Sequence, residues 1–378
     1  MHNNKTVVIR ALCAAAVACA LPLAQAAPTY SVVDLGTLGG SWSYGSGINA
    51  GGQVTGYANT AGWAAQQHAF LYSGGVMQDL GTLGGTLSAG SGINAGGQVT
   101  GYAYTAGNAA IHAFLYSGGV MQDLGTLGGT SSYGSGINAG GQVTGYADTA
   151  GNAAQHAFLY SGGVMQDLGT LGGTYSYGSG INAGGQVTGS AATAGDAAQH
   201  AFLYSGGVMQ DLGTLGGSWS QGFGINAGGQ VTGRAATAGD AAQHAFLYSG
   251  GVMQDLGTLG GAYSYGFGIN AGGQVTGTSW ITGNAAVHAF LYSGGVMLDL
   301  NDLIDPLSGW TLREAEDIND AGQIAAYGCS SILNQCHALR LDPINQAPEP
   351  GSLALLGLAL AGLAGRKSGK QLHSRSTS

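Results

Sequence analysis

Histidine and aspartate recur at a regular spacing along this 378-residue chain, and both residue types can carry protons or bind metal ions. The histidines open seven HAF or HAL tripeptides: His68, His112, His156, His200, His244, His288 and His337. The aspartates open seven DL pairs: Asp34, Asp79, Asp123, Asp167, Asp211, Asp255 and Asp299. A catalytic dyad needs a nucleophile in the same pocket, and no unique nucleophile accompanies these copies. We therefore expect each histidine to hydrogen-bond an aspartate of the neighbouring strand.

A ring of these histidines around a central channel is the alternative, and such a ring would suit a metal ion. We expect the structural role, and the sequence predicts no metal site and no cofactor.

Carboxylates gather in one place, the seventh repeat unit. Residues 301–317 contain Asp302, Asp305, Trp310, Arg313, Glu314 and Glu316 in a body that is otherwise poor in charge. A glycosidase needs two converging carboxylates, so a propeller glycoside hydrolase or lyase using Glu314 and Glu316 is one interpretation. We expect instead a solvated segment that stabilises ring closure, in a protein that is not an enzyme.

Aromatic residues vary between copies that are otherwise nearly identical. One variable window follows each LGG and includes Trp42, Tyr44, Tyr175, Trp219 and Tyr263. A second window follows each VTG and includes Tyr57, Tyr102, Tyr146, Arg234 and Trp280. We expect both windows to be loops, where recognition usually lies. Packing between blades is the simpler role for these rings, and stacking on sugar rings is the alternative.

The net charge limits the partners that the protein can have. Residues 27–350 keep three arginines and all 18 acidic residues, which gives a net charge of −15 with neutral histidines. We expect such a body not to bind nucleic acid, because that binding depends on lysine and arginine. The 74 glycines show no three-residue period, which excludes collagen.

The elements that carry these residues form a repeat with a regular period of 44 residues between about 30 and 342. The β-branched and aromatic residues of each unit predict four short strands. In the second unit these strands are Gly90–Ala95, Gln98–Ala103, His112–Tyr116 and Val120–Leu124. Asn-Ala-Gly-Gly and Ser-Gly-Gly segments predict the tight turns between them. Four strands in about 40–50 residues are typical of a propeller blade.

The phase of the repeat predicts how the ring closes. The chain enters the repeats with Tyr30–Leu35, a fourth strand, and leaves them at His337–Asp342, a third strand. Pairing these two strands would hide both edges. We therefore predict an all-β, seven-bladed β-propeller closed by the N-terminal strand, with a β-solenoid as the alternative.

The repeated phrases HAFLY, DLGTLGG and INAGGQ resemble the HAF-repeat family of bacterial extracellular proteins. The resemblance covers residues 30–342 and is looser in the seventh unit. It implies export and a propeller-like fold, and it implies no established chemistry.

The two ends predict export. Residues 1–26 read as a signal peptide with a cleavage site at Ala24-Gln25-Ala26, which makes signal peptidase a partner. At the other end, Pro348-Glu349-Pro350, an uncharged stretch at 351–365 and the basic pair Arg366-Lys367 stand in that order. That order resembles the PEP-CTERM sorting signal of Gram-negative bacteria, which implies an exosortase as a partner.

These segments divide the chain into a signal peptide (1–26), a repeat propeller (27–347) and a sorting signal (348–378). The stretch 351–365 is short for a permanent anchor, so transient membrane insertion is expected. We expect the body to lie in the cell envelope or the extracellular matrix, as a structural or binding scaffold associated with exopolysaccharide and biofilm. A carbohydrate-binding lectin is a further alternative.

Two cysteines remain once the signal peptide is removed, Cys329 and Cys336. Six residues separate them, unlike the two of a redox CxxC motif. In an oxidising compartment they should form a disulfide.

Overall fold

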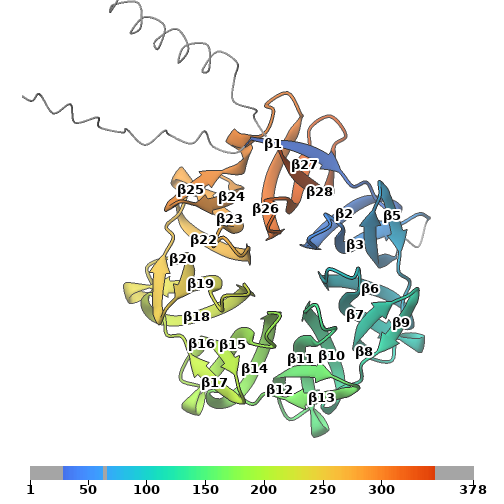
Figure 1. Ribbon diagram of the computed structural model, residues 1–378, viewed down its shortest axis with the longest axis vertical. Helices are drawn as coiled ribbons and strands as arrows, with labels where there is room; N and C mark the ends of the chain where they lie inside the picture. The colour runs from blue at the N-terminus through green and yellow to red at the C-terminus, as the bar shows by residue number, and fades with distance from the viewer. Residues whose placement is uncertain (1–28, 63–65, 345–378) are drawn as a thin grey trace, which may run out of the picture.

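A computed structural model describes residues 29–62 and 66–344 of the chain. These residues form 28 strands, arranged as seven four-stranded blades around a central channel (Figure 1). The predicted all-β propeller is confirmed, and the β-solenoid alternative is wrong, because the blades follow one another in a closed ring.

The four strands of a blade are antiparallel, and the first of them lies beside the channel (Figure 1). Blades 1 to 3 contain β2 (Gly39–Ile48), β3 (Val54–Thr60), β4 (Gln67–Ser73), β5 (Val76–Asp79), β6 (Gly84–Ile93), β7 (Val99–Thr105), β8 (Ile111–Ser117), β9 (Val120–Asp123), β10 (Gly128–Ile137), β11 (Val143–Thr149), β12 (Gln155–Ser161) and β13 (Val164–Asp167). Blades 4 to 6 contain β14 (Gly172–Ile181), β15 (Val187–Thr193), β16 (Gln199–Ser205), β17 (Val208–Asp211), β18 (Gly216–Ile225), β19 (Val231–Thr237), β20 (Gln243–Ser249), β21 (Val252–Asp255), β22 (Gly260–Ile269), β23 (Val275–Ile281), β24 (Val287–Ser293) and β25 (Val296–Asp299). Blade 7 contains β26 (Trp310–Ile318), β27 (Ile324–Ser330), β28 (Gln335–Ile344) and β1 (Thr29–Asp34).

Short 3-10 segments lie between the second and third strands of blades 2 to 6, and one more precedes blade 7. They are η1 (Ala106–Asn108), η2 (Ala150–Asn152), η3 (Ala194–Asp196), η4 (Ala238–Asp240), η5 (Thr282–Asn284) and η6 (Leu300–Leu303).

Local sequence explains the hairpins. Gly74 and Gly75 join β4 to β5 with φ values of 59° and 87°. Two positive φ values in a two-residue loop match the twist of the flanking strands, and glycine adopts them without strain. The equivalent glycine pairs repeat this turn through blade 6.

The predicted first strand of each unit was too short. It was expected from Gly90 in the second unit, and β6 begins at Gly84 instead. The added residues are held partly by side chains, since the Asn108 Oδ1 atom accepts from the Thr86 amide at 2.9 Å. The Ser88 hydroxyl further accepts from the Ala69 amide of blade 1 at 2.8 Å.

The N-terminal strand closes the ring as predicted. Strand β1 pairs antiparallel with β28, and Thr29 lies opposite Ile344. The blade is therefore completed by segments more than 300 residues apart, and the edge of β28 is covered.

The apolar core is divided into clusters between neighbouring blades. The cluster between blades 1 and 2 contains Ala69 and Leu80 from one blade and Val99, Ala103 and Phe114 from the other. Equivalent clusters lie between the other blades. Burial of these side chains is the main force that holds the ring together.

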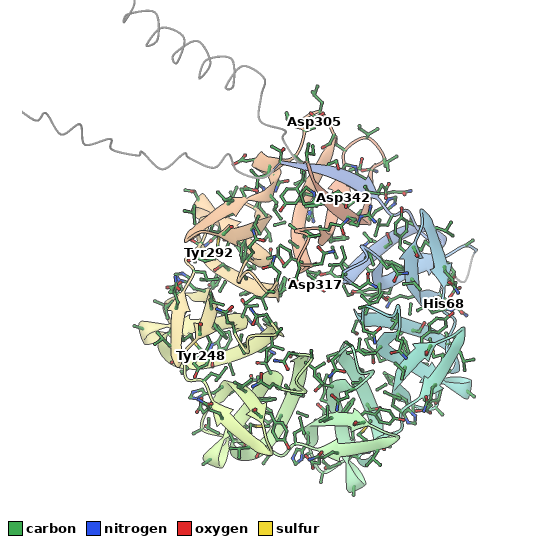
Figure 2. The ribbon with its side chains drawn as sticks, in the orientation of Figure 1. His68, Tyr248, Tyr292, Asp305, Asp317 and Asp342 are labelled. Carbon is green, nitrogen blue, oxygen red and sulfur yellow. A yellow bond between two sulfur atoms is a disulfide. The ribbon has the colours of Figure 1, made fainter. Side chains whose placement is uncertain are left out.

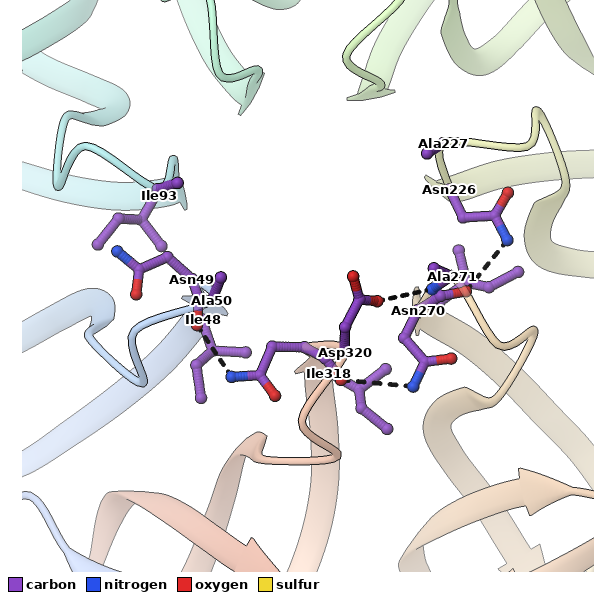
Figure 3. Close-up of a pocket in the computed structure, with 13 residues that line it drawn as sticks. Ile48, Asn49, Ala50, Ile93, Asn226, Ala227, Asn270, Ala271, Ile318 and Asp320 are labelled. Atoms are coloured by element: carbon purple, nitrogen blue, oxygen red, sulfur yellow. Dashed lines mark hydrogen bonds between the residues drawn. The ribbon is translucent and has the colours of Figure 1, made fainter.

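Seven asparagines form a hydrogen-bonded ring at one end of the channel. Figure 3 shows the part of this ring that includes Asn49, Asn226 and Asn270. The Nδ2 atom of each donates to the backbone carbonyl of the equivalent asparagine in the next blade, and Asn319 completes the circuit by donating to Asn49 at 2.9 Å. The members are Asn49, Asn94, Asn138, Asn182, Asn226, Asn270 and Asn319.

The two faces of the disc differ, and we name them by their loops. The turn face carries the Asn49–Gly52 and Ser73–Gly75 turns and their equivalents. The two turns of a blade are adjacent, because the Gln53 side chain donates to the Ser73 hydroxyl at 2.9 Å. The connector face carries η1 to η5 and the links between blades, such as 80–83.

A disulfide joins Cys329 and Cys336, which lie opposite each other on β27 and β28. It crosses one hairpin of blade 7, and Cys336 belongs to β28, the strand that pairs with β1.

Candidate binding site at the channel mouth

The histidines and aspartates form seven hydrogen-bonded pairs, with 2.5–2.9 Å between Nδ1 and the nearer carboxylate oxygen. Six pairs join the third and fourth strands of one blade, and the seventh joins His337 of β28 to Asp34 of β1. Each aspartate also accepts from a backbone amide two residues on, as Asp79 does from Gly81 at 2.8 Å. These contacts hold the outer edge of each blade.

The alternative of a histidine ring around the channel is wrong. The histidines lie on third strands, two strands away from the channel, and Figure 2 shows His68 toward the periphery of the ring. Within residues 29–62 and 66–344, no three His, Cys, Asp or Glu side chains are grouped to hold a metal ion.

The variable aromatic residues lie in strands, not in loops, so that part of the prediction was wrong. Trp42 and Tyr44 belong to β2, Tyr175 to β14, Trp219 to β18 and Tyr263 to β22. The second window falls mainly in second strands, including Tyr57 in β3, Tyr102 in β7, Tyr146 in β11, Arg234 in β19 and Trp280 in β23.

Three variable positions of each blade converge around the channel on the connector side of the asparagine ring. One position lines the channel itself and carries Ser46, Ser91, Ser135, Ser179, Phe223, Phe267 and Glu316. A second position, two residues earlier in the first strand, carries Tyr44, Ala89, Tyr133, Tyr177, Gln221, Tyr265 and Glu314. Its cross-strand partners are Tyr57, Tyr102, Tyr146, Ser190, Arg234, Thr278 and Tyr327. Because the rest of the blade is nearly constant, differences in chemistry are concentrated here.

A cavity of about 450 Å³ opens on this side over blades 3 to 5. We call it the tyrosine pocket; it is lined by Tyr133, Ser135, Tyr146, Gln155, Tyr177, Gly178, Ser179 and Gln221. None of these side chains is charged.

The three tyrosines of the pocket pack against one another across blade boundaries. Tyr133 and Tyr146 stack with ring centroids 4.8 Å apart, and Tyr146 meets Tyr177 of the next blade edge to face at 5.0 Å. Burial raises the pKa of Tyr146 to about 12, so its hydroxyl remains a hydrogen-bond donor at neutral pH. The rings therefore pack against one another, as the simpler interpretation of the sequence expects, and they remain partly exposed.

Two glutamines of the pocket are held in defined orientations by charged neighbours. The Gln155 amide nitrogen donates to Asp148 at 2.9 Å, so the carbonyl oxygen of the same side chain can accept a hydrogen bond from another donor. The Gln221 carbonyl oxygen accepts from Arg234 at 3.0 and 3.2 Å, which leaves its amide free to donate. The pocket thus offers one fixed acceptor and one fixed donor beside aromatic faces.

Arg234 is itself fixed by aromatic rings. Its guanidinium carbon lies 4.6 Å from the centroid of Tyr265 and 5.3 Å from that of Trp219. This cation–π packing positions the group that orients Gln221.

On the opposite side of the ring, blade 7 presents carboxylates. The Tyr44 hydroxyl of blade 1 lies within hydrogen-bond distance of both Glu314 and Glu316, the latter at 2.5 Å. Burial, opposed in part by this hydrogen bond, raises the pKa of Glu316 to about 8. Burial and the two carboxylates hold the pKa of Tyr44 well above its usual range.

Asp317 lies next to this pair and has a structural role. Its carboxylate accepts from the Ile48 amide of blade 1 at 3.0 Å and from the Ile318 amide at 2.9 Å. Burial raises its pKa to about 6. Figure 2 shows Asp317 beside the channel.

The charged segment of the seventh unit, which we expected to be solvated, is so only in part, because Trp310–Ile318 form β26, and its carboxylates do not form one cluster in space. Glu314 and Glu316 lie toward the channel, whereas Asp302 and Asp305 are exposed, and Asp305 is at the outer edge of blade 7 (Figure 2). Asp302 lies in η6, which leads into β26. A constellation of all four carboxylates is therefore excluded.

Comparisons with known proteins identify the C-terminal segment. Residues 346–368 match the PEP-CTERM protein-sorting motif. This motif directs export to the cell envelope or beyond, with processing by an exosortase. The signal peptide, its cleavage site and the residues of the motif itself lie outside the described part of the structure. No helix within the described ranges is long and apolar enough to cross a membrane.

Solved structures show likeness of fold alone. The chain is similar to the β-propeller domain of the Trilobed protease from Pyrococcus furiosus, with 9% identity, a TM-score of 0.53, and coverage of 81% of this chain and 99% of that one. TolB from Acinetobacter baumannii has 12% identity and a TM-score of 0.41, covering 78% of this chain and 80% of that one. AofleA from Arthrobotrys oligospora has the same identity and score, covering 72% and 88%. The search of curated proteins gives no match.

Gln155 was missed from the sequence, whereas Gln221 belongs to the first variable window but was not expected to be a binding residue. Gln155 belongs to a nearly constant QHAF phrase, so only its neighbours Asp148 and Tyr146 vary. Gln221 stands where most copies have tyrosine, and that difference was the available signal.

Proposed function

We propose that this exported propeller is a non-enzymatic, saccharide-binding scaffold of the envelope or extracellular matrix, and that it holds exopolysaccharide at the tyrosine pocket. The observation that carries the proposal is the uncharged, aromatic lining of the 450 Å³ cavity. Its size falls within the range of small-molecule sites. Resemblance of the repeats to HAF-repeat extracellular proteins and the sorting motif both support a place in the matrix.

Chemistry favours a neutral sugar. Aromatic faces pack against the apolar face of a pyranose ring, while fixed donors and acceptors bond its hydroxyls. Gln155 and Gln221 supply such groups in set orientations, and the serine hydroxyls at Ser135 and Ser179 can do both. The net charge of the body opposes binding of a polyanion.

Binding of the processed protein to a panel of polysaccharides, including the producer's own matrix polymer, tests the proposal. We expect saturable binding to an uncharged polymer, and at least a tenfold loss of affinity in Tyr146→Ala. Tyr57→Ala is the matched control, because it removes the same repeat position on the far side of the ring. Equal loss in both variants, or no binding to any polymer, would contradict the proposal.

A glycoside hydrolase or lyase is the rival function. Glu314 and Glu316 are the two carboxylates at the channel, and both are engaged with Tyr44. Product release from the bound polymer, lost in Glu316→Gln and retained in Tyr146→Ala, would favour the rival. Binding without release of shorter chains favours the scaffold.

A further inference from the structure

The two ends of the described chain leave the disc on one face. Strand β28 ends at Ile344, opposite Thr29, the first residue of β1. Asp342, near the end of β28, accepts from the Gln323 side chain at 2.7 Å. This contact is the equivalent of the Gln53–Ser73 bond, so both ends lie on the turn face, at the outer edge of blade 7 (Figure 1).

The tyrosine pocket opens toward the other face. Gln155 is the first residue of β12, directly after the connector-face segment η2. Tyr133 lies five residues before the turn at Asn138–Gly141, and its cross-strand partner Tyr146 lies five residues after that turn, at the middle of β11. At the outer edge of blade 7, the ten residues of β28 run without a bulge from the connector face to the turn face and span about 30 Å.

The sorting motif starts two residues after Ile344. Only seven residue steps separate Ile344 from Gly351, where the uncharged stretch begins. Even fully extended, that length of chain reaches about 25 Å. It is therefore shorter than the thickness of the disc.

We propose that, while the C-terminal segment is held at the membrane or its processed end is attached to the cell surface, the propeller lies with its turn face toward that surface and the tyrosine pocket toward the medium. The inverted arrangement would require the tether to pass along the whole edge of the disc, which it is too short to do. The orientation itself does not depend on the proposed function; only the identity of the ligand, a saccharide polymer, rests on it. In this orientation a polymer outside the cell would reach the tyrosine pocket without passing beneath the disc.

Two matched cysteine variants of the full chain test this orientation. Ala139→Cys places a thiol on the turn face of blade 3, and Ala153→Cys places one on the connector face of the same blade; both alanines are exposed. Cys329 and Cys336 are in a disulfide, so after removal of residues 1–26 the introduced thiol is the reactive one. The measurement is the rate of labelling by a membrane-impermeant 5 kDa maleimide-polyethylene glycol on intact producing cells, repeated after detergent solubilisation.

We expect Ala153→Cys to label at least fivefold faster than Ala139→Cys on cells, and the two rates to become equal in detergent. Insertion of twenty glycine and serine residues after Asn345 should remove the difference on cells, because a flexible linker of that length adds roughly 25 Å of reach. Equal or reversed rates without the insertion, or recovery of the protein from the medium alone, would overturn the orientation.

Tyr146→Ala separates this proposal from the proposed function. Loss of polysaccharide binding with an unchanged labelling ratio leaves the orientation standing. A ratio of one with intact binding overturns the orientation and leaves the binding function standing.

Discussion

Blade 7 and the other six blades solve the same packing problem in different ways. In blades 1 to 6 the first strand carries a serine whose hydroxyl oxygen accepts a hydrogen bond from a backbone amide of the preceding blade. The six serines are Ser43, Ser88, Ser132, Ser176, Ser220 and Ser264. In blade 7 the residue at the equivalent place in the first strand is Leu312, which lies opposite Gly328 and is fully buried. At this position the repeated blades add a hydrogen bond to the apolar contact between neighbouring blades, whereas blade 7 meets blade 6 there through the buried Leu312 side chain.

A second difference concerns the channel. The six copies have glycine where blade 7 has Asp317, and serine or phenylalanine where it has Glu316. The regular blades place glycine and neutral side chains at these positions, whereas blade 7 places two partly buried carboxylates beside the channel. The blade that closes the ring therefore also carries the carboxylates that line the channel.

The largest effect is expected from removing the closing strand. Deletion of residues 29–34 exposes the edge of β28 and removes Tyr30 from the core cluster of blade 7 together with the Asp34–His337 pair. We expect loss of cooperative unfolding, or a fall of more than about 5 kcal/mol in the free energy of unfolding. Thermal unfolding followed by circular dichroism measures it, and an unchanged transition would contradict closure by β1.

The next largest effect is expected from substitutions at the two kinds of junction between blades, which should cost different amounts of stability. Leu312→Ala leaves a cavity in a fully buried cluster, and such changes cost about 2–5 kcal/mol. Ser132→Ala leaves the Ala113 amide without its partner, which costs about 1–3 kcal/mol. Urea unfolding of both variants compares them; a larger loss in the serine variant would reverse the distinction drawn between the junctions.

Glu316 should make the stability depend on pH. Its folded-state pKa, about 8, lies above the unfolded value of 4.5, so the folded protein keeps a proton that the unfolded chain releases. This group therefore does not lower the free energy of unfolding below about pH 4.5, where it is protonated in both states. Between about pH 4.5 and pH 8 the free energy of unfolding falls as the pH rises. We expect Glu316→Gln to be more stable than the parent at pH 8, by about 1–3 kcal/mol, with a smaller difference at pH 5.

Denaturant unfolding at the two pH values measures this effect. Asp305→Asn is the control, because it removes an exposed carboxylate of the same blade. A pH dependence that is unchanged in Glu316→Gln would show that this side chain is not the group responsible.

The smallest effect concerns the histidine pairs. His337 is 6% exposed and joins two distant segments, whereas His112 pairs within one hairpin with the more exposed Asp123. We expect His337→Ala to cost about 2 kcal/mol and His112→Ala about 0.5–1 kcal/mol. Melting temperatures of the two variants at pH 7 rank them, and equal shifts would remove the special role of the closing pair.

The fold could be predicted because its signals are local or periodic. Glycine pairs such as Gly74 and Gly75 mark hairpins directly, and the fourth-strand pattern at Tyr30–Leu35 shows how the ring closes. The start of the first strand could not be read in the same way. Gly84 to Thr86 look like a loop in sequence, and distant side chains, among them Asn108, hold them in a strand.

The candidate site was predicted only in its residue types. Variation between copies drew attention to Tyr146 and Tyr175, yet their meeting with Tyr177 and Gln221 depends on strand register and on contacts between blades. Raised carboxylate pKa values at Glu316 and Asp317 likewise follow from burial, which composition does not reveal.

The asparagine ring bears on how this gene could change length. Every link in it is made by the same two groups, a side-chain amide and a main-chain carbonyl 44 residues further on in the regular units. A chain that lost residues 139–182, or gained a second copy of them, would still present a matching donor and acceptor at each junction. Unequal recombination between the tandem copies would therefore produce rings of six or eight blades in which every asparagine still has its hydrogen-bond partner. Only the curvature that each blade imposes would then decide which of these rings closes.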